Sequence, residues 1–159
     1  MEQKIVIGFT GTRKGMSKHQ EVVVKLFFAL SRPKVAVHGD CIGADSEFHN
    51  IALDLQVPIY IFPSNLATRA HCSGYAMIYP PQPALTRNKS IVNMSNLMLA
   101  CPHTEQEVLR SGTWATIRYA RKVNKEYYII YPSGKVVHNG FPVLLSSQVT
   151  STLKEAYNA

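Results

Sequence analysis

Apolar residues along this chain follow two different spacings. Short runs that are apolar over most of their length lie at 4–10, 35–38, 57–62, 96–101 and 126–131. Between these runs, apolar residues recur every three or four positions, which is the period of a helix with one buried face. Strands that helices cover on both faces read as continuous apolar runs. The pattern therefore predicts strands that alternate with helices.

Helical spacing begins after Ser17, which forms a capping-box pattern with Gln20. Three more helices are expected, over 44–55, 85–94 and 112–123. The proline-containing segment 63–83 reads as irregular, and a loop of that length in a compact domain is usually functional or poorly ordered. Residues 133–159 are expected to form a C-terminal extension with a polar turn, an apolar stretch at Phe141–Leu145 and a short terminal helix.

The alternation of strands and helices favours βαβ units with right-handed crossovers and a parallel sheet. We therefore predict an α/β, Rossmann-like, doubly wound fold: a mainly parallel sheet of five or more strands with helices on both faces. The 159 residues fit a single domain whose core spans about 4–132. Ligands bind such sheets beyond the carboxyl ends of the strands, so the residues that follow each strand are the candidate site residues.

Composition and charge narrow the range of partners. A hydrophobic content of 46% excludes a disordered chain. Lys and Arg number 17 against 10 Asp and Glu, and the net charge of +7 favours an anionic partner. The basic residues are scattered, so nucleic acid is allowed but not favoured. The three cysteines lack zinc-site spacing and no apolar run is long enough to cross a membrane. We therefore expect a cytoplasmic protein with no metal and no membrane partner.

The first candidate segment follows the first strand and reads GFTGTRKG. Gly11 allows a ligand to approach the backbone closely, Thr12 adds a hydroxyl group, and Arg13 adds a positive charge. The spacing of the glycines differs from both the Walker A loop and the GxGxxG motif. We expect phosphate contact at these residues, and the alternative is a tight turn with a solvated basic tip.

The second candidate segment, HGDCIGAD, joins the second strand to a helix. Gly39 and Gly43 flank a turn, and Ala44 opens a helix whose N-terminus favours anions. Asp40 and Asp45 are candidates for holding ribose hydroxyls and for acting as catalytic carboxylates. The alternative for Asp40 is to cap this helix, and the alternative for Asp45 is to stabilise the helix from its first turn.

A second helix N-terminus suited to phosphate is predicted at Ser111, Gly112 and Thr113, with Ser111 as the N-cap. Glu105 and Glu107 precede this helix and are further candidate catalytic carboxylates.

Arg87 and Asn88 begin the helix that precedes the strand at 96–101, and they are candidate ligand-binding residues. The apolar face of this helix would contain Leu85, Ile91 and Val92, which places Arg87 off the core. From there its guanidinium would reach a ligand phosphate or form a surface ion pair.

Four segments in this order, GFTGTR, HGDCIGAD, LTRNKSIV followed by NLMLAC, and SGTWATIRYAR, resemble the SLOG superfamily of Rossmann-like nucleotide-binding proteins. This superfamily includes DNA-processing protein A, the lonely-guy phosphoribohydrolases and molybdenum-cofactor-carrier-like proteins. The resemblance covers about 4–132 and is closest to small stand-alone members from bacteria and phages. It implies a nucleotide or nucleotide-derived ligand, bound through the glycine turns, and a homo-oligomer.

The resemblance also bears on catalysis. By position, the segment 111–113 matches the phosphate-binding Gly-Gly-x-Gly-Thr segment of the phosphoribohydrolases, but the Pro-Gly-Gly lead is missing. The catalytic glutamate of those enzymes would fall near Thr116 or Ile117, and neither is a carboxylate. We therefore predict a nucleotide-binding protein that senses, carries or sequesters its ligand and requires no cofactor. The alternatives are an N-glycosidic hydrolase of a nucleotide or an NAD-like dinucleotide, and a DNA-binding protein.

Overall fold

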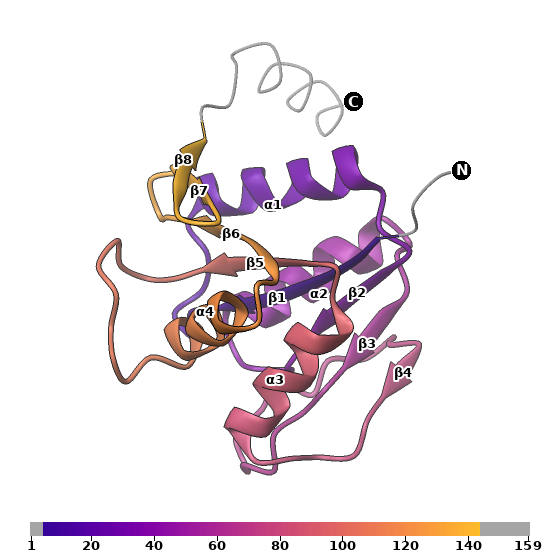
Figure 1. Cartoon of the computed structure of the whole chain (residues 1–159). Coiled ribbons are helices and arrows are strands. Elements are labelled where there is room, and N and C mark those ends of the chain that lie inside the picture. The colour runs from indigo at the N-terminus through magenta and orange to yellow at the C-terminus, as the bar shows by residue number, and fades with distance from the viewer. Residues whose placement is uncertain (1–4, 144–159) are drawn as a thin grey trace.

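One sheet of eight strands runs through the molecule (Figure 1), and its strand order is β4-β3-β2-β1-β5-β6-β7-β8. The computed structural model describes residues 5–143. The parallel strands are β1 (Val6–Gly11), β2 (Val35–His38), β3 (Ile59–Ile61), β4 (Met77–Ile78), β5 (Leu97–Cys101) and β6 (Glu126–Ile130). Two antiparallel strands complete the sheet beside β6: β7 (Val136–His138) and β8 (Phe141–Val143).

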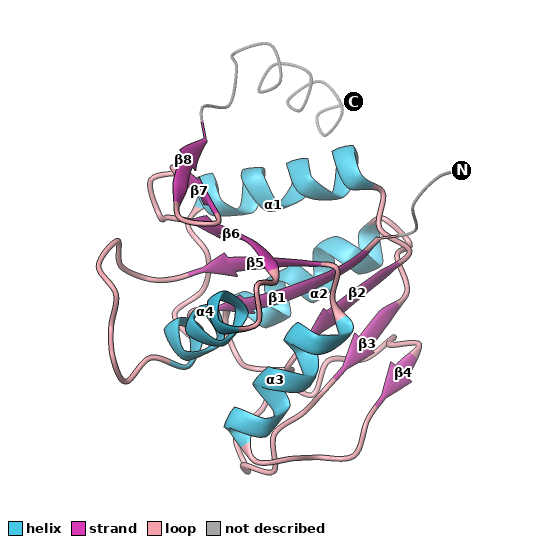
Figure 2. Ribbon diagram, viewed as in Figure 1, coloured by secondary structure: helices cyan, strands magenta, loops and turns pink. Residues whose placement is uncertain are grey.

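Helices cover both faces of this sheet. They are α1 (Lys18–Ser31), α2 (Ala44–Asp54), α3 (Ala84–Met94) and α4 (Gly112–Lys122). The helices α1 and α2 pack on one face, and α3 and α4 pack together on the other (Figure 2). Within residues 5–143, no helix has the length and apolar character needed to span a bilayer. The predicted Rossmann-like α/β fold is confirmed.

Gln20, at the start of α1, both caps the helix and attaches it to the sheet. Ser17 and Gln20 form the predicted capping box, because each side chain accepts a hydrogen bond from the other residue's backbone N–H. The Gln20 amide also donates to the carbonyls of Pro102 and Ile130, both at 2.8 Å. This buried side chain therefore ties α1 to the carboxyl ends of β5 and β6.

Three short strands were not predicted from the sequence. The segment 63–83, predicted to be irregular, contains β4, which has two residues and pairs with β3. The polar turn expected after residue 133 leads into β7, and Phe141–Val143 of the predicted apolar stretch forms β8. Elements this short contain too few residues for a period to appear. The rest of that stretch and the predicted terminal helix lie outside the described residues.

The turns that follow β1 and β2 pack directly against each other. Gly43 has a φ of +88°, and a Cβ atom added there would lie 2.3 Å from the Arg13 carbonyl oxygen. The next residue, Ala44, donates its N–H to the Thr12 carbonyl at 3.0 Å. Only glycine at position 43 permits this approach. It sets the position of the α2 N-terminus relative to the β1–α1 turn.

Two histidines form a buried chain of hydrogen bonds behind β2. The Asp40 N–H donates to His38 Nδ1 at 2.9 Å, His38 Nε2 lies 2.8 Å from His49 Nδ1, and His49 Nε2 lies 2.6 Å from the Ser73 carbonyl oxygen. A carbonyl only accepts, so His49 donates from Nε2, and His38 donates from Nε2 to His49. Burial, with a further contribution from His49, lowers the pKa of His38 to about 3.

A buried carboxylate closes the β2–α2 turn. Asp45 accepts hydrogen bonds from the N–H groups of Gly39 and Cys41, at 3.1 and 3.2 Å. Burial nevertheless raises the pKa of Asp45 to about 6, because desolvation of the charged form outweighs these bonds.

We expect Gly43→Ala to destabilise the fold by about 1–3 kcal/mol, since alanine would adopt a left-handed backbone conformation against the Arg13 carbonyl. Chemical denaturation measures the loss. Gly112→Ala is the matched control: its φ is not positive, and its added methyl group meets no atom within 4 Å. That change should stay within about 1 kcal/mol of the parent. Equal losses in the two variants would contradict the packing argument.

We also expect Asp45→Asn to be more stable than the parent at neutral pH and to lose that advantage on acidification. The folded parent keeps the Asp45 proton up to a pKa of about 6, whereas the unfolded chain releases it at the ordinary value of 3.8. The stability due to this group is therefore present below pH 3.8 and is lost as the pH rises through 6. The difference reaches at most about 3 kcal/mol, and denaturation curves across this range measure it.

The lowered pKa of His38 acts in the opposite direction, because the folded state loses stability as the pH falls below 6.5. Both proteins contain His38, so its contribution cancels in the difference between their stabilities. A difference that does not change with pH would contradict the raised pKa of Asp45.

Candidate ligand-binding site

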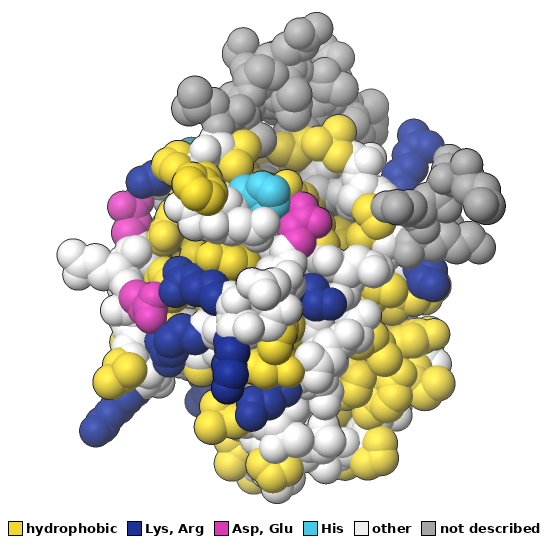
Figure 3. All heavy atoms as spheres, viewed as in Figure 1, with side chains coloured by type: hydrophobic (Ala, Val, Ile, Leu, Met, Phe, Trp, Pro, Cys, Tyr) yellow, Lys and Arg dark blue, Asp and Glu magenta, His cyan; other side chains and the backbone are white. Residues whose placement is uncertain are grey.

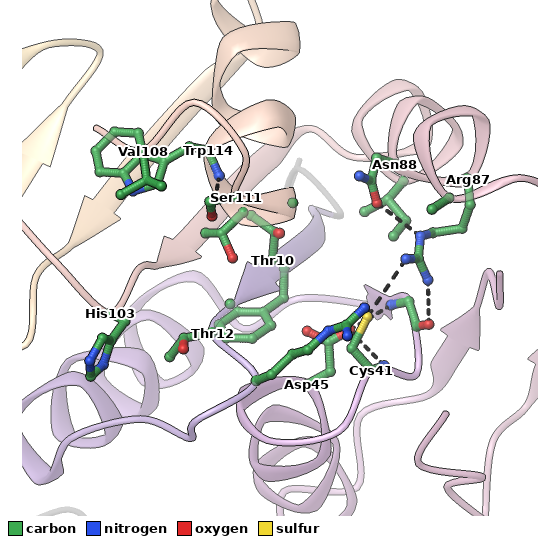
Figure 4. Close-up of a pocket in the computed structure, with 18 of the residues that line it drawn as sticks. Thr10, Thr12, Cys41, Asp45, Arg87, Asn88, His103, Val108, Ser111 and Trp114 are labelled. Atoms are coloured by element: carbon green, nitrogen blue, oxygen red, sulfur yellow. Dashed lines mark hydrogen bonds between the residues drawn. The ribbon is translucent and has the colours of Figure 1, made fainter. Parts of the chain in front are cut away.

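A cavity of about 580 Å³ opens at the carboxyl edge of the sheet, between the turns that follow β1, β2 and β5. The strand order reverses between β1 and β5, and ligands of doubly wound sheets bind at such a reversal. Figure 4 shows the cavity with its lining side chains. The predicted site residues that line it are Gly11, Thr12, Arg13, Gly39, Asp45, Arg87, Asn88, Ser111, Gly112 and Thr113.

The N-terminus of α4 presents free backbone donors to this cavity. The Ser111 hydroxyl caps the helix by accepting from the Trp114 N–H at 3.3 Å. The N–H groups of Gly112 and Thr113 make no hydrogen bond within the described part of the chain. A Cβ atom added to Gly112 would meet nothing within 4 Å. These donors, together with the positive end of the helix dipole, favour an anion.

Arg13 lies opposite, on the β1–α1 turn. Its exposed guanidinium makes no hydrogen bond or ion pair with any residue from 5 to 143. The neighbouring Lys14 donates its N–H to the Thr12 hydroxyl at 3.1 Å, and its Nζ lies 3.4 Å from Nε2 of His103. This rim of the cavity is therefore basic, and the Arg13 charge is available to a ligand.

Arg87 corrects a prediction. The sequence placed it off the core and Leu85 on the core, but Arg87 is 6% exposed and Leu85 is 65% exposed. The Arg87 guanidinium reaches backbone carbonyls from two other segments, since Nη1 donates to Gly39 at 2.6 Å and to Phe62 at 3.3 Å. These bonds stabilise a buried position that apolar periodicity does not reveal.

The remaining Arg87 donors reach neutral groups. Nε donates to the Asn88 side chain at 2.8 Å, and Nη2 lies 3.6 Å from the Cys41 sulfur. No carboxylate hydrogen-bonds to this buried cation within the described residues, and the Asp45 carboxylate interacts with it only through space. A buried charge without a direct partner is costly. An anion in the cavity would offset that cost. Burial, with the nearby Asp45 charge, raises the pKa of Cys41 to about 11, so its thiol remains protonated at neutral pH.

The structure separates the four candidate catalytic carboxylates, and only Asp45 lines the cavity. Asp40 is fully buried and does not line the cavity. Its carboxylate accepts from Arg69 at 2.7 Å and from the N–H groups of His71 and Cys72 at 3.1 and 2.9 Å. Burial alone would raise the pKa of Asp40, but these bonds lower it. Asp40 therefore anchors the segment after β3.

Glu105 and Glu107 also lie outside the cavity lining. Glu107 pairs with Arg121 at 2.9 Å and with Arg118 at 3.2 Å, and the hydrogen bond from Arg121 lowers its pKa. Glu105 accepts from the Ser133 hydroxyl at 3.4 Å. Both carboxylates hold the β5–α4 loop to neighbouring segments.

Two further predicted ligand residues, Gly43 and Ala44, do not line the cavity. They pack the turn after β2 against the turn after β1. The sequence missed Thr10, Cys41, His103 and Arg110, which do line it. Arg110 directly precedes the predicted N-cap Ser111, and this position beside a predicted phosphate site could have identified it as a candidate ligand residue.

His38, His49 and Cys72 place three potential metal-ligand atoms within 4.8 Å of one another. A neutral histidine that binds metal through Nε2 must carry its proton on Nδ1. Nδ1 of His38 instead accepts the Asp40 N–H. The hydrogen bonds of this cluster therefore suit two neutral histidines better than a metal ion.

No protein-family model matches the chain, and a search of curated proteins finds no match. Solved structures do match its fold. A molybdenum cofactor binding protein from Rippkaea orientalis is 15% identical with a TM-score of 0.62, over 99% of this chain and 87% of that protein.

Two further structures agree with this match. The structural genomics target TM1055 is 10% identical with a TM-score of 0.56, over 79% of this chain and 72% of the target. DNA processing protein A from Helicobacter pylori, studied for its single-stranded DNA binding mode, is 17% identical with a TM-score of 0.54. The match covers 98% of this chain and 74% of that protein. Two of the three, the molybdenum cofactor binding protein and DNA processing protein A, are of the kinds that the sequence motifs resemble. The chain therefore shares with these structures the Rossmann-like fold that its sequence predicted.

Proposed function

We propose that this protein binds a nucleotide or a nucleotide-derived small molecule and acts as a sensor, carrier or sequestering protein. The observation that carries the proposal is the convergence of three anion-favouring groups on one cavity: the guanidiniums of Arg13 and Arg87, and the open N-terminus of α4. The cavity volume, about 580 Å³, falls in the range of small-molecule sites.

The cavity offers a separate place for each part of such a ligand. Its phosphate would accept from the N–H groups of Gly112 and Thr113 while Arg13 closes over it. Asp45 and the Thr10 hydroxyl are the neighbouring polar groups for a sugar. Fold neighbours that include a molybdenum cofactor binding protein support a small-molecule ligand.

Single-stranded DNA is a second candidate. Lys and Arg side chains gather on the face that α3 and α4 cover (Figure 3), and DNA processing protein A is among the fold neighbours. Arg118 and Arg121 on this face already pair with Glu107, which reduces the charge available to phosphates. A gel shift that weakens steeply with salt would favour DNA.

If the ligand is also hydrolysed, Asp45 is the carboxylate positioned to take part. It is the carboxylate among the described residues that lines the cavity, and its pKa of about 6 suits proton transfer near neutral pH. Asp40, Glu105 and Glu107 are held by other partners, as described above. The binding proposal does not depend on this step.

Arg13→Ala should weaken the binding of ADP by about 1.5–3 kcal/mol, the range for a hydrogen bond to a charged group. Isothermal titration calorimetry measures the change. Lys122→Ala is the matched control, since it also removes one exposed positive charge but lies at the end of α4, outside the cavity lining. Gly112→Val should also reduce affinity, because its side chain would project into the open space at the helix N-terminus. Unchanged affinity in both cavity variants would reject the proposed phosphate site.

Asp45→Asn tests turnover separately from binding. If the parent releases a free base from nucleotides or NAD, the variant should release it about 10²–10⁴ times more slowly while affinity changes far less. Chromatography of the reaction mixture measures release, and Glu107→Gln is the control that should leave it unchanged. Equal release by Asp45→Asn and the parent would remove Asp45 from catalysis. A parent that retains its ligand intact supports the binding protein.

A further inference from the structure

We infer that the indole N–H of Trp114 is a second recognition group of this cavity, which donates to an oxygen or nitrogen acceptor on the base of the ligand. The inference rests on the proposed function, because it concerns the same cavity. The proposed site already requires a phosphate on the ligand. The inference adds that the ligand carries a ring with a neutral hydrogen-bond acceptor.

Trp114 carries a polar atom that its surroundings leave without a partner. The side chain is 3% exposed, and Nε1 is the buried side-chain nitrogen or oxygen in residues 5–143 that has no hydrogen-bond partner. Buried indole N–H groups ordinarily find an acceptor, because a buried donor without one destabilises the fold. The indole N–H of Trp114 has no acceptor among the described residues, so a ligand is the group that would supply one.

The indole of Trp114 lies at the wall of the candidate cavity. Trp114 lies in the first turn of α4, and both Trp114 and Val108 line the cavity. Figure 4 shows the indole beside Val108, at the opposite end of the cavity from Arg87, with Ser111 and Thr10 between them in this view. A phosphate at the α4 N-terminus would therefore leave the Val108 end for another part of the ligand.

Two arginines of α4 hold the loop that carries Val108. Arg118 donates to the Leu109 carbonyl at 2.9 Å and pairs with Glu107, as does Arg121. Exposed pairs of this kind stabilise little, and Val108 itself is 42% exposed. An acceptor atom reaches the buried Nε1 only if neighbouring side chains move, and Val108 is one side chain beside the indole (Figure 4).

The chemistry of the indole selects the kind of group it would bind. Its N–H donates only and carries no charge, whereas a phosphate is better served by Arg13 and by the backbone donors of Gly112 and Thr113. Val108 and the indole also form an apolar wall against which a flat ring packs well. A carbonyl oxygen or ring nitrogen of a nucleobase meets both conditions.

Trp114 is the only tryptophan, so a ¹H–¹⁵N spectrum contains a single indole signal. We would titrate the protein separately with AMP, GMP, CMP, UMP and ribose 5-phosphate, the last of which lacks a base. The Gly112 and Thr113 amide signals should move with the phosphate-bearing ligands that bind, including ribose 5-phosphate. The indole signal should move downfield with at least one nucleotide and stay in place with ribose 5-phosphate.

The outcomes separate this inference from the proposed function. Amide signals that move while the indole signal stays in place with every nucleotide would overturn the inference and leave the phosphate site standing. An indole signal that moves equally with ribose 5-phosphate would overturn it as well. If no amide signal moves with any of these ligands, the proposed site and the inference both fail.

Trp114→Phe keeps an aromatic ring and removes the donor. It should weaken the binding of the responsive nucleotide about five- to tenfold, the effect of one neutral hydrogen bond, and leave ribose 5-phosphate unchanged. Tyr119→Phe is the matched control, because it removes a hydroxyl that bonds to Asn93 at 2.8 Å, outside the cavity lining. Equal affinities of the parent and Trp114→Phe would overturn the inference, and the spectrum of the parent decides it if the variant does not fold.

Discussion

The reversal of strand order at β1 is the constraint on which the rest of the structure depends. From β1 the chain proceeds to β2 and β3 through α1 and α2, which cover one face of the sheet. It then returns to β5 on the other side of β1 and places α3 and α4 on the opposite face. Right-handed crossovers require this change of face when the direction reverses. The turns after β1 and β5 therefore diverge, and the cavity lies where they separate.

The polar groups around this opening divide into two kinds. Some form their hydrogen bonds within the protein. Asp40 holds the segment after β3, and the hydrogen-bond chain through His38 and His49 ends at the Ser73 carbonyl. Others retain unused capacity at the cavity, as do the Gly112 N–H and, among the described residues, the Arg13 guanidinium. The first kind makes the turns rigid, and rigid turns keep the second kind in place for a ligand. The fold and the candidate site are thus built from the same short segments.

The sequence predicted the longer elements well because apolar runs and helical spacing report burial directly, and the alternation of strands and helices predicted the fold. Side-chain direction was harder to predict. Asp40 has a φ of 59°, and its carboxylate points to Arg69, 29 residues away in the chain, instead of to the cavity. Glu107 was a catalytic candidate by its place before α4, but Arg118 and Arg121 engage it. Arg87 owes its burial to carbonyls from distant segments, and no local pattern encodes such contacts.

The hydrogen-bond chain through His38 and His49 has a fixed polarity. It begins at an amide N–H, which can only donate, and ends at a carbonyl oxygen, which can only accept. The two ring protons between them therefore have a single arrangement, and a flip of either ring would set donor against donor or leave an acceptor unpaired. The chain cannot relay a proton in either direction without breaking one of its ends. The pair thus acts as a polar strut between the end of β2 and the segment at Ser73, and its rings should turn over only when that part of the protein opens.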